Sequence, residues 1–529
     1  PTCAMIATGD EQVRKRAKVA LPSQDEQKQL QQVETLMQSN LLGLQVNELL
    51  GEVDGDTKLQ KKKLQKWVQL LKEALASDGA GMDGTELSGS WLKKQRRKCG
   101  LALRLVNEED ASLKFMYEKP SSLSVVGSST TRTTTSPYLN VDLAVCMPSS
   151  AFDSRDILNH RYFDKRKLYL AALSLCLQDP QLGLAAQDIQ FAAFKGDERK
   201  PLLVFPCPAA PHICIRLVPA LADGVFKHVQ LRANKSNVRG SQEGRFSPTP
   251  LYNLAILEDM ALLMQHGILQ KSLAAAPALA QALVLFKVWL TQRGLRFRAD
   301  GFDGHHAGLL LAYLLQTRRL SASAGGPLSA FQAALTFIAE GQLLSALDFT
   351  ATAIKARDCW RDGVLAADSS VSVSTADCPG LQHTAALDET VMWDYLRPLQ
   401  LAHPISAGGT AKYNCLWRVS SSAALQLQAE ARRSLQELRG AEHSCFQHLF
   451  MQGRSFFESH DQFFHFTVPA QTLDLSSDGE EGRAQAEVLL QCCPAQHFAA
   501  RAQQLLRQGL GDRVAAVHAT VCPLEAEGG

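Results

Sequence analysis

Residues 127–142, "GSSTTRTTTSPYLNVD", combine residue types that can hold a nucleotide and divalent metal ions. The Gly127-Ser128 turn can bring backbone N–H groups close to phosphate oxygens. Asn140 and Asp142 stand at alternate positions of an expected strand, so their side chains point to one face. Nucleotidyl transfer needs carboxylates at such positions, because acids bracket the ions that activate the attacking hydroxyl and stabilise the leaving pyrophosphate. The pattern predicts either a two-metal active site or the remnant of one.

The charges in this region favour the remnant. Asp142 supplies one carboxylate, but Asn140 offers a neutral amide at the partner position. The expected neighbouring strand, "HICIRLV", places Cys214 and Arg216 on one face instead of a third acid. Arg216, if it faces the site, repels a divalent cation. We therefore expect no metal and no cofactor here.

Two observations keep the active alternative open. Gly-Ser and Asn-x-Asp are common pairs, so the pattern alone has little specificity. Asp197 and Glu198 lie in a charged loop whose position the sequence does not give. An RNA nucleotidyltransferase that uses Asp142 and an acid from elsewhere is therefore the alternative, and a module that binds nucleotides without turnover is a third hypothesis.

The basic residues of the chain are unevenly distributed. The 529 residues carry a formal charge of only +2, yet clusters at residues 14–18, 58–66 and 93–98 make the N-terminal hundred residues locally basic. Such clusters suit nuclear import or a phosphate-rich partner. The alternative for each cluster is a solvated helix face.

The cysteines and apolar runs point to an intracellular protein with no membrane partner. The 13 cysteines include no C-x-x-C pair, and Cys492-Cys493 with His497 does not match a zinc spacing. The longest apolar stretch, residues 273–286, contains Pro277 and is too short to cross a bilayer.

The hydrophobic pattern predicts a multidomain α+β chain. Helices are expected at residues 24–50, 59–76 and 156–178 and repeatedly between 252 and 349, and a third α+β unit is expected after a loop at 366–380. Strands are expected at 122–126, 141–147, 202–205, 212–218, 384–393 and 413–419. The predicted domains are a basic helical region (1–90), an α/β domain (91–248), a helical domain (249–365) and a third α+β domain (366–529).

Several long motifs, in order, resemble the Nrap (nucleolar RNA-associated protein) family. The resemblance covers about residues 30–315 and is weaker beyond residue 358. It is carried by "LMQSNLLGLQVNELL" (36–50), "VVGSSTTRTTTSPYLNVDLAVCMP" (125–148), "LNHRYFDKRKLYLAALSLCL" (158–177), "NKSNVR" (234–239), "PTPLYN" (248–253), "ALVLFKVWLTQRG" (282–294) and "GFDGHHAGLLLAYLL" (301–315).

This resemblance implies a fold and a function. It implies a nucleotidyltransferase-like domain, a helical domain like that of poly(A) polymerase and oligoadenylate synthetase, and a third α+β domain. The family repeats this module, so the chain looks like an N-terminal half. It also implies a catalytically silent, nucleolar, structural component of the small-subunit processome, with precursor ribosomal RNA, an rRNA-processing partner and the casein-kinase-containing subcomplex as partners.

Three groups of basic residues are candidates for RNA or partner binding, through phosphate contacts that are sensitive to salt. The alternatives are solvated charge and pairing with acids of this chain. The groups are the helix residues Arg161, Lys165, Arg166 and Lys167, the loop residues Arg232, Lys235, Arg239 and Arg245, and the N-terminal basic region. Few aromatic residues interleave these charges, so the sequence does not predict a base-stacking surface.

Overall fold

The computed structural model describes two stretches of the chain and a few residues beyond them. These are residues 41–341, with gaps at 60–61, 78–81, 102, 109, 232–234, 239–248, 299, 317–318 and 321–325, residues 415–454, with gaps at 420 and 441–443, and isolated residues between 461 and 517. Most of the predicted third domain, the expected strand at 384–393 and the Cys492-Cys493 pair lie outside these residues.

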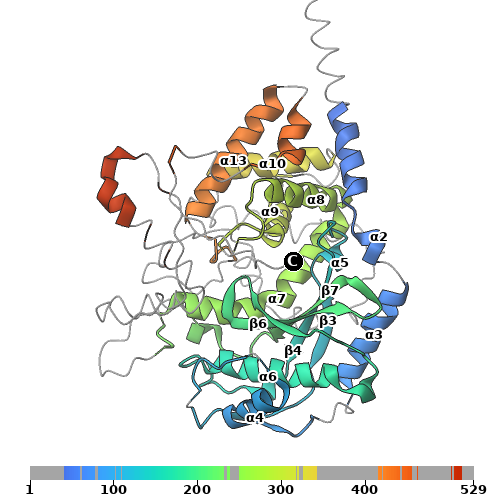
Figure 1. Ribbon diagram of the computed structural model, residues 1–529. Helices are drawn as coiled ribbons and strands as arrows, with labels where there is room; N and C mark the ends of the chain where they lie inside the picture. Colours follow the sequence, from blue (N-terminus) through green and yellow to red (C-terminus); the bar gives the residue numbers. More distant parts are fainter. Residues whose placement is uncertain are drawn as a thin grey trace, which may run out of the picture.

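A five-stranded mixed sheet carries the candidate site (Figure 1). Its strand order is β3-β4-β7-β6-β5. β4 and β7 run parallel, whereas the other neighbouring pairs are antiparallel. The strands are β3 (Ser122–Val126), β4 (Asn140–Met147), β5 (Gln190–Phe194), β6 (Asp197–Cys207) and β7 (Ala210–Leu221).

The two faces of the sheet are covered by different helices. Figure 1 shows α6 (Arg161–Gln178) and α7 (Pro250–Ala275) on opposite sides of the sheet. On the α7 side, Ala144 of β4 packs in a small apolar cluster against Leu262 and Leu263 of α7. Because side chains alternate along a strand, Asn140 and Asp142 share the face of Ala144. The candidate site therefore lies on the α7 side.

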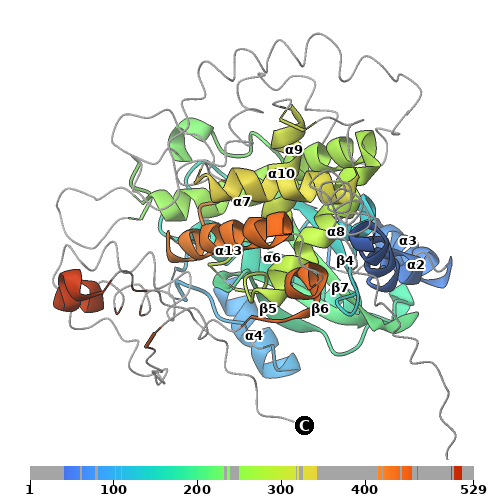
Figure 2. The same cartoon turned by 90° about the horizontal axis from the view of Figure 1, so that it is seen from above.

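A layer of helices stacks beyond α7. Each of α7, α8 and α10 has proline in its first turn, where the missing N–H costs no helical hydrogen bond. Figure 2, seen from above, shows α10 and α13 side by side at the top of this layer. The helices are α8 (Pro277–Gln292), α9 (Gly304–Gln316), α10 (Pro327–Ala339) and α13 (Ser421–Gly440).

The N-terminal part packs against the sheet domain and shares its apolar core. In α4 the Ser88 hydroxyl caps the first turn, and Gly100 ends the helix in the left-handed conformation. The elements are a helix at residues 41–52, α2 (Asp56–Leu59), α3 (Lys62–Ala76), β1 (Glu86–Ser88), α4 (Gly89–Cys99) and β2 (Lys114–Met116).

The predicted α+β class is confirmed, and most expected elements are present with small shifts. The strand predicted at 122–126 is found with those bounds, and β4 begins one residue earlier than expected. β1, β2, α4 and β5 were not predicted. Residues 415–419 form turns instead of the expected strand. The domain boundaries stay predictions.

Among the described residues, no single helix is long and apolar enough to cross a bilayer. α7 and α8 together pass that test by length and composition, but the chain bends by 116° between them.

Buried ion pairs join α7 to the sheet domain. Asp259 lies 2.9 Å from Nε of Arg166 on α6 and 2.8 Å from Nζ of Lys200 on β6. Glu258 lies 2.6 Å from the same lysine and 2.8 Å from the guanidinium of Arg418. Burial alone raises the pKa of Glu258, but the charges of Arg418 and Lys200 hold it well below its usual value. These contacts fix the helical layer against the sheet.

We expect Asp259→Asn to lower the free energy of unfolding by about 3–5 kcal/mol, because the substitution leaves Arg166 and Lys200 as buried cations with too little negative charge. The matched control is Glu86→Gln, which breaks a 3.2 Å pair with Lys114 whose two side chains are 52% and 60% exposed. That change should cost at most about 1 kcal/mol. Urea unfolding followed by circular dichroism measures both, and equal effects would contradict the structural role given to Asp259.

Candidate functional site

The Gly-Ser turn at the end of β3 packs directly against the Asp142 carboxylate. Gly127 has φ of +76°, which favours glycine. A Cβ at this position would lie 2.8 Å from Oδ2 of Asp142, so a side chain does not fit. The short helix α5 (Ser128–Thr131) follows the turn. The sequence prediction that Gly127, Ser128, Asn140 and Asp142 come together is consistent with this arrangement.

An arginine holds both oxygens of the Asp142 carboxylate. The parallel register of β4 and β7 places Asp142 beside Arg216 and Asn140 beside Cys214. Nε of Arg216 donates to Oδ1 of Asp142 at 2.5 Å, and a terminal guanidinium nitrogen donates to Oδ2 at 2.7 Å. The amide of Asn140 also donates to Oδ1, at 2.8 Å. Three donor contacts thus converge on the one acid of the site.

These donors do not fit a two-metal site. Arg216 stays protonated: burial lowers its pKa, but the adjacent Asp142 carboxylate reverses this and raises it overall. Asp197 is buried and paired with Arg199 and Arg418, so its carboxylate is committed elsewhere. Across the described ranges, no group of three His, Cys, Asp or Glu residues is placed to hold a metal ion.

The backbone N–H of the turn is also occupied. Gly127 donates to Nδ1 of His266, on α7, at 3.3 Å. Burial lowers the pKa of His266 to about 4, so the ring is neutral and Nδ1 can accept this bond. Nε2 of the same ring lies 3.2 Å from the Thr130 hydroxyl, which donates to the Gly127 carbonyl. The turn that could approach a phosphate is instead bonded to a helix.

The polar loop after α5 is held from the helical layer. Nζ of Lys287, on α8, donates to the Thr133 carbonyl at 2.6 Å and lies 3.1 Å from its hydroxyl. Arg296 donates to the Thr135 hydroxyl at 3.1 Å. Lys287 is buried, and Gly304 lies so close that a Cβ there would be 2.7 Å from its side chain.

The N-terminal part holds the same loop from another side. Gly55 donates to the Thr134 carbonyl at 3.0 Å. The Asp56 carboxylate accepts from the Thr134 N–H at 3.3 Å. The loop is therefore a structural joint between three parts of the chain.

The first basic group is not an exposed patch, and this prediction was wrong. Lys165, Arg166 and Lys167 are buried, and the Arg161 side chain is only 22% exposed. Their charges are used inside the chain. Arg161 pairs with Asp110 and Asp156, Lys165 with Asp156, Arg166 with Asp259, and Lys167 donates to the Arg104 carbonyl. The alternative of pairing with acids of this chain applies, because α6 is covered on all sides and a buried cation needs a partner.

The other two basic groups are described only in part. Lys235 is exposed, whereas Arg232, Arg239 and Arg245 lie outside the described residues. The Lys235 carbonyl accepts from the Asn253 side chain at 3.0 Å, so the "NKSNVR" and "PTPLYN" motifs anchor each other. Several lysines and arginines of α3 and α4 are exposed, which keeps the N-terminal group a candidate.

Comparison with known proteins identifies the family that this chain resembles. Residues 87–274 match the family model described as Nrap protein domain 1. The resemblance to the Nrap family is confirmed. "Nucleolar protein 6" of Xenopus laevis is 30% identical over 460 residues, and that of Mus musculus is 30% identical over 462. Each match covers 84% of this chain and 36% of the relative, so the chain spans about a third of their length.

"Nucleolar protein 6" of Homo sapiens is 33% identical over 322 residues, covering 58% of this chain and 27% of the human protein. The name that these relatives carry is consistent with the predicted nucleolar location.

Similar solved structures include E. coli MS115-1 CdnC with ATP and the Cid1 poly(U) polymerase with MgGTP. The first has a TM-score of 0.38 at 12% identity and covers 77% of this chain and 97% of CdnC. The second has a TM-score of 0.37 at 11% identity and covers 78% and 99%.

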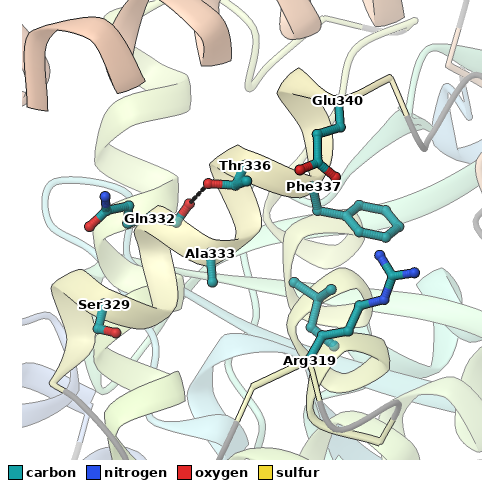
Figure 3. Close-up of a pocket in the computed structure, with 8 residues that line it drawn as sticks. Arg319, Ser329, Gln332, Ala333, Thr336, Phe337 and Glu340 are labelled. Atoms are coloured by element: carbon teal, nitrogen blue, oxygen red, sulfur yellow. Dashed lines mark hydrogen bonds between the residues drawn. The ribbon is translucent and has the colours of Figure 1, made fainter. Parts of the chain in front are cut away.

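A pocket of about 430 Å³ lies outside the Nrap domain 1 match, between α9 and α10 (Figure 3). In Figure 3 the Arg319 side chain faces the Phe337 ring, with the guanidinium carbon 5.2 Å from the ring centroid. No residue predicted for the site lines this pocket. Its lining is Leu314, Arg319, Ser329, Gln332, Ala333, Thr336, Phe337 and Glu340.

The sequence analysis did not identify two residues that bond the Gly127 turn and the loop after it, His266 and Lys287. Lys287 lies in an apolar helix segment, where the sequence gives no sign that its amine is buried and bonded to Thr133. His266 gave no signal, because an isolated histidine in an apolar helix resembles core packing.

We expect the stability difference between the wild type and Lys287→Met to depend on pH. Burial lowers the pKa of Lys287 from 10.5 to about 7. Between these values the unfolded chain holds the proton and the folded chain does not, so wild-type stability rises with pH relative to the variant, by at most about 1.4 kcal/mol per pH unit. Urea unfolding at pH 7 to 10 measures this. Lys271→Met, on an exposed lysine of α7, should show no such trend, and a flat Lys287→Met difference would contradict the assignment.

Proposed function

We propose that this chain is a non-catalytic, structural component of precursor ribosomal RNA processing that acts by binding RNA and proteins. The observation that carries the proposal is the Arg216–Asp142 ion pair, reinforced by Asn140. These residues turn a site that needs several negative charges into one whose net charge is zero.

The electrostatics of nucleotidyl transfer explain why this matters. Two divalent ions bring four positive charges, which several carboxylates must offset before a triphosphate can bind. Here one carboxylate is already neutralised by a guanidinium at 2.5 and 2.7 Å. A metal ion would have to displace Arg216 and then sit beside its charge. These residues favour a permanent ion pair and leave no metal ion to activate the hydroxyl of a substrate.

The relatives support the biological setting. Proteins named "Nucleolar protein 6" match most of this chain, and their name refers to the nucleolus, where ribosomal RNA is made and processed. We infer that the chain works in the small-subunit processome. The partners that follow from the family resemblance are precursor ribosomal RNA, an rRNA-processing partner protein and the casein-kinase-containing subcomplex.

If the chain is non-catalytic, it should not extend an RNA primer. The purified chain, incubated with labelled ATP or UTP, an RNA primer and Mg²⁺ or Mn²⁺, should give no product, because the Asp142 carboxylate is held by Arg216. Asp142→Asn should be indistinguishable from the wild type. Extension by the wild type that Asp142→Asn abolishes would establish the alternative, an active RNA nucleotidyltransferase.

If the chain acts in ribosomal RNA processing, its depletion should cause a processing defect. Its role in processing should not depend on Asp142. Depleting the protein should lower mature small-subunit rRNA and raise its precursors, as measured by northern blotting. A re-expressed copy carrying Asp142→Asn should restore processing as well as the wild type does, because the carboxylate takes part in no reaction and the 41%-exposed Arg216 side chain can be solvated without it. Normal maturation after depletion would refute the proposed setting.

A further inference from the structure

Two exposed aromatic rings lie beside the start of β4 with an arginine against them. The Tyr138 and Phe297 residues are 48% and 60% exposed. Their ring centroids are 4.6 Å apart, with the planes inclined at 55°. The guanidinium carbon of Arg296 lies 5.6 Å from the Tyr138 centroid and 4.8 Å from the Phe297 centroid. We call Tyr138, Arg296 and Phe297 the aromatic cluster.

The aromatic cluster is held in place rather than loosely exposed. Arg296 is bonded to Thr135, in the loop that leads to Tyr138, at 3.1 Å. Tyr138 stands two residues before Asn140, the first residue of β4, and Phe297 follows soon after the end of α8. The two rings therefore come from different parts of the chain. The loop that leads to Tyr138 is the one that Lys287 bonds through Thr133.

The charges around the cluster favour an anionic ligand. The Lys58 side chain is exposed and donates to the Ser136 hydroxyl, two residues before Tyr138, at 3.1 Å. The Arg296 guanidinium adds a second positive charge against the two rings. The nearby acids are engaged within the chain: Asp54 accepts the Asp56 N–H at 2.8 Å, Asp56 accepts the Thr134 N–H, and Asp303, whose charge acts on Arg296, lies 3.3 Å from Nζ of Lys195. Exposed rings next to cations are the combination that binds single-stranded nucleic acid, by stacking bases and neutralising phosphates.

We propose that the aromatic cluster of Tyr138, Arg296 and Phe297 is a stacking site for the bases of single-stranded RNA. The proposal rests on the RNA-binding part of the proposed function and assigns it to a place. Bases stack on the exposed rings, while Lys58, bonded to Ser136, supplies a charge that can meet a backbone phosphate. Double-stranded RNA does not fit, because its bases are already stacked and their faces are closed. A protein partner would be indifferent to the bases of an RNA competitor.

The test is fluorescence anisotropy with the full chain and a short fluorescein-labelled oligouridylate. Tyr138→Ala and Phe297→Ala should each weaken binding about tenfold, because stacking is lost with the ring. Tyr138→Phe and Phe297→Tyr keep a ring and should bind as the wild type does. Met116→Ala, at a residue of β2 that is 49% exposed, controls for the loss of an exposed apolar side chain. Unfolding midpoints confirm that each variant folds.

An abasic oligonucleotide of the same length separates stacking from charge. The wild type should bind it about as weakly as the alanine variants bind oligouridylate, and the alanine changes should not weaken it further. Oligouridylate binding that is unchanged in both alanine variants would overturn the stacking site but leave RNA binding by this chain intact. If the wild type binds no RNA at all, both the stacking site and the RNA-binding part of the proposed function fall.

Discussion

Two adjacent carboxylates on α7, Glu258 and Asp259, hold the helical layer to the sheet, and the geometry of the candidate site follows from that attachment. Asp259 is fully buried and lies between Arg166 on α6 and Lys200 on β6. Burying so much charge is costly, so pairs of this kind specify an arrangement more than they stabilise it. They set the position of α7 over one face of the sheet. His266, two turns further along that helix, consequently reaches the Gly127 turn.

The nucleotide-like features of the loop are bonded to other parts of the chain. A Gly-Ser turn and a polar loop could bind phosphates only if their donors were free. Here two donors are engaged, because the Gly127 N–H donates to His266 and the Thr134 N–H donates to Asp56. The carbonyl groups of Thr133 and Thr134 in turn accept bonds from Lys287 and Gly55. Each bond joins the loop to a different part of the chain. The polar residues that suggest chemistry in the sequence therefore serve as the joint between sheet, helices and N-terminal region.

The sequence predicted the local structure well and the charge pairing poorly, for a physical reason. Alternation and helical periodicity are local, so β3 was predicted with its observed bounds and β4 within one residue. Ion pairing is not local. Arg166 of α6 and Lys287 of α8 gave no sign of burial because their partners lie far away in sequence: Arg166 and Asp259 are 93 residues apart, and Lys287 and Thr133 are 154 apart. Arg161 and Lys165 pair with the nearby Asp156, but the sequence does not show that this part of α6 is covered. The absence of an acid at position 140, by contrast, follows from the residue type alone. In the structure the Asn140 amide donates to Asp142. The Tyr138–Phe297 contact escaped notice for the same reason as the ion pairs.

Under the proposed non-catalytic role, the Arg216–Asp142 pair keeps the architecture of such a site without its chemistry. The Asp142 carboxylate sits against the Gly127 turn, so leaving it without a counter-charge would strain the start of both β4 and β7. Arg216 supplies that charge from the neighbouring strand, and it does so permanently, since a guanidinium neither dissociates nor loses its proton at neutral pH. Asn140 completes the pattern by donating to the same carboxylate that a second acid would repel. The neutral amide and the arginine are thus complementary: together they stabilise one isolated aspartate in a site that needs no ion to stay folded.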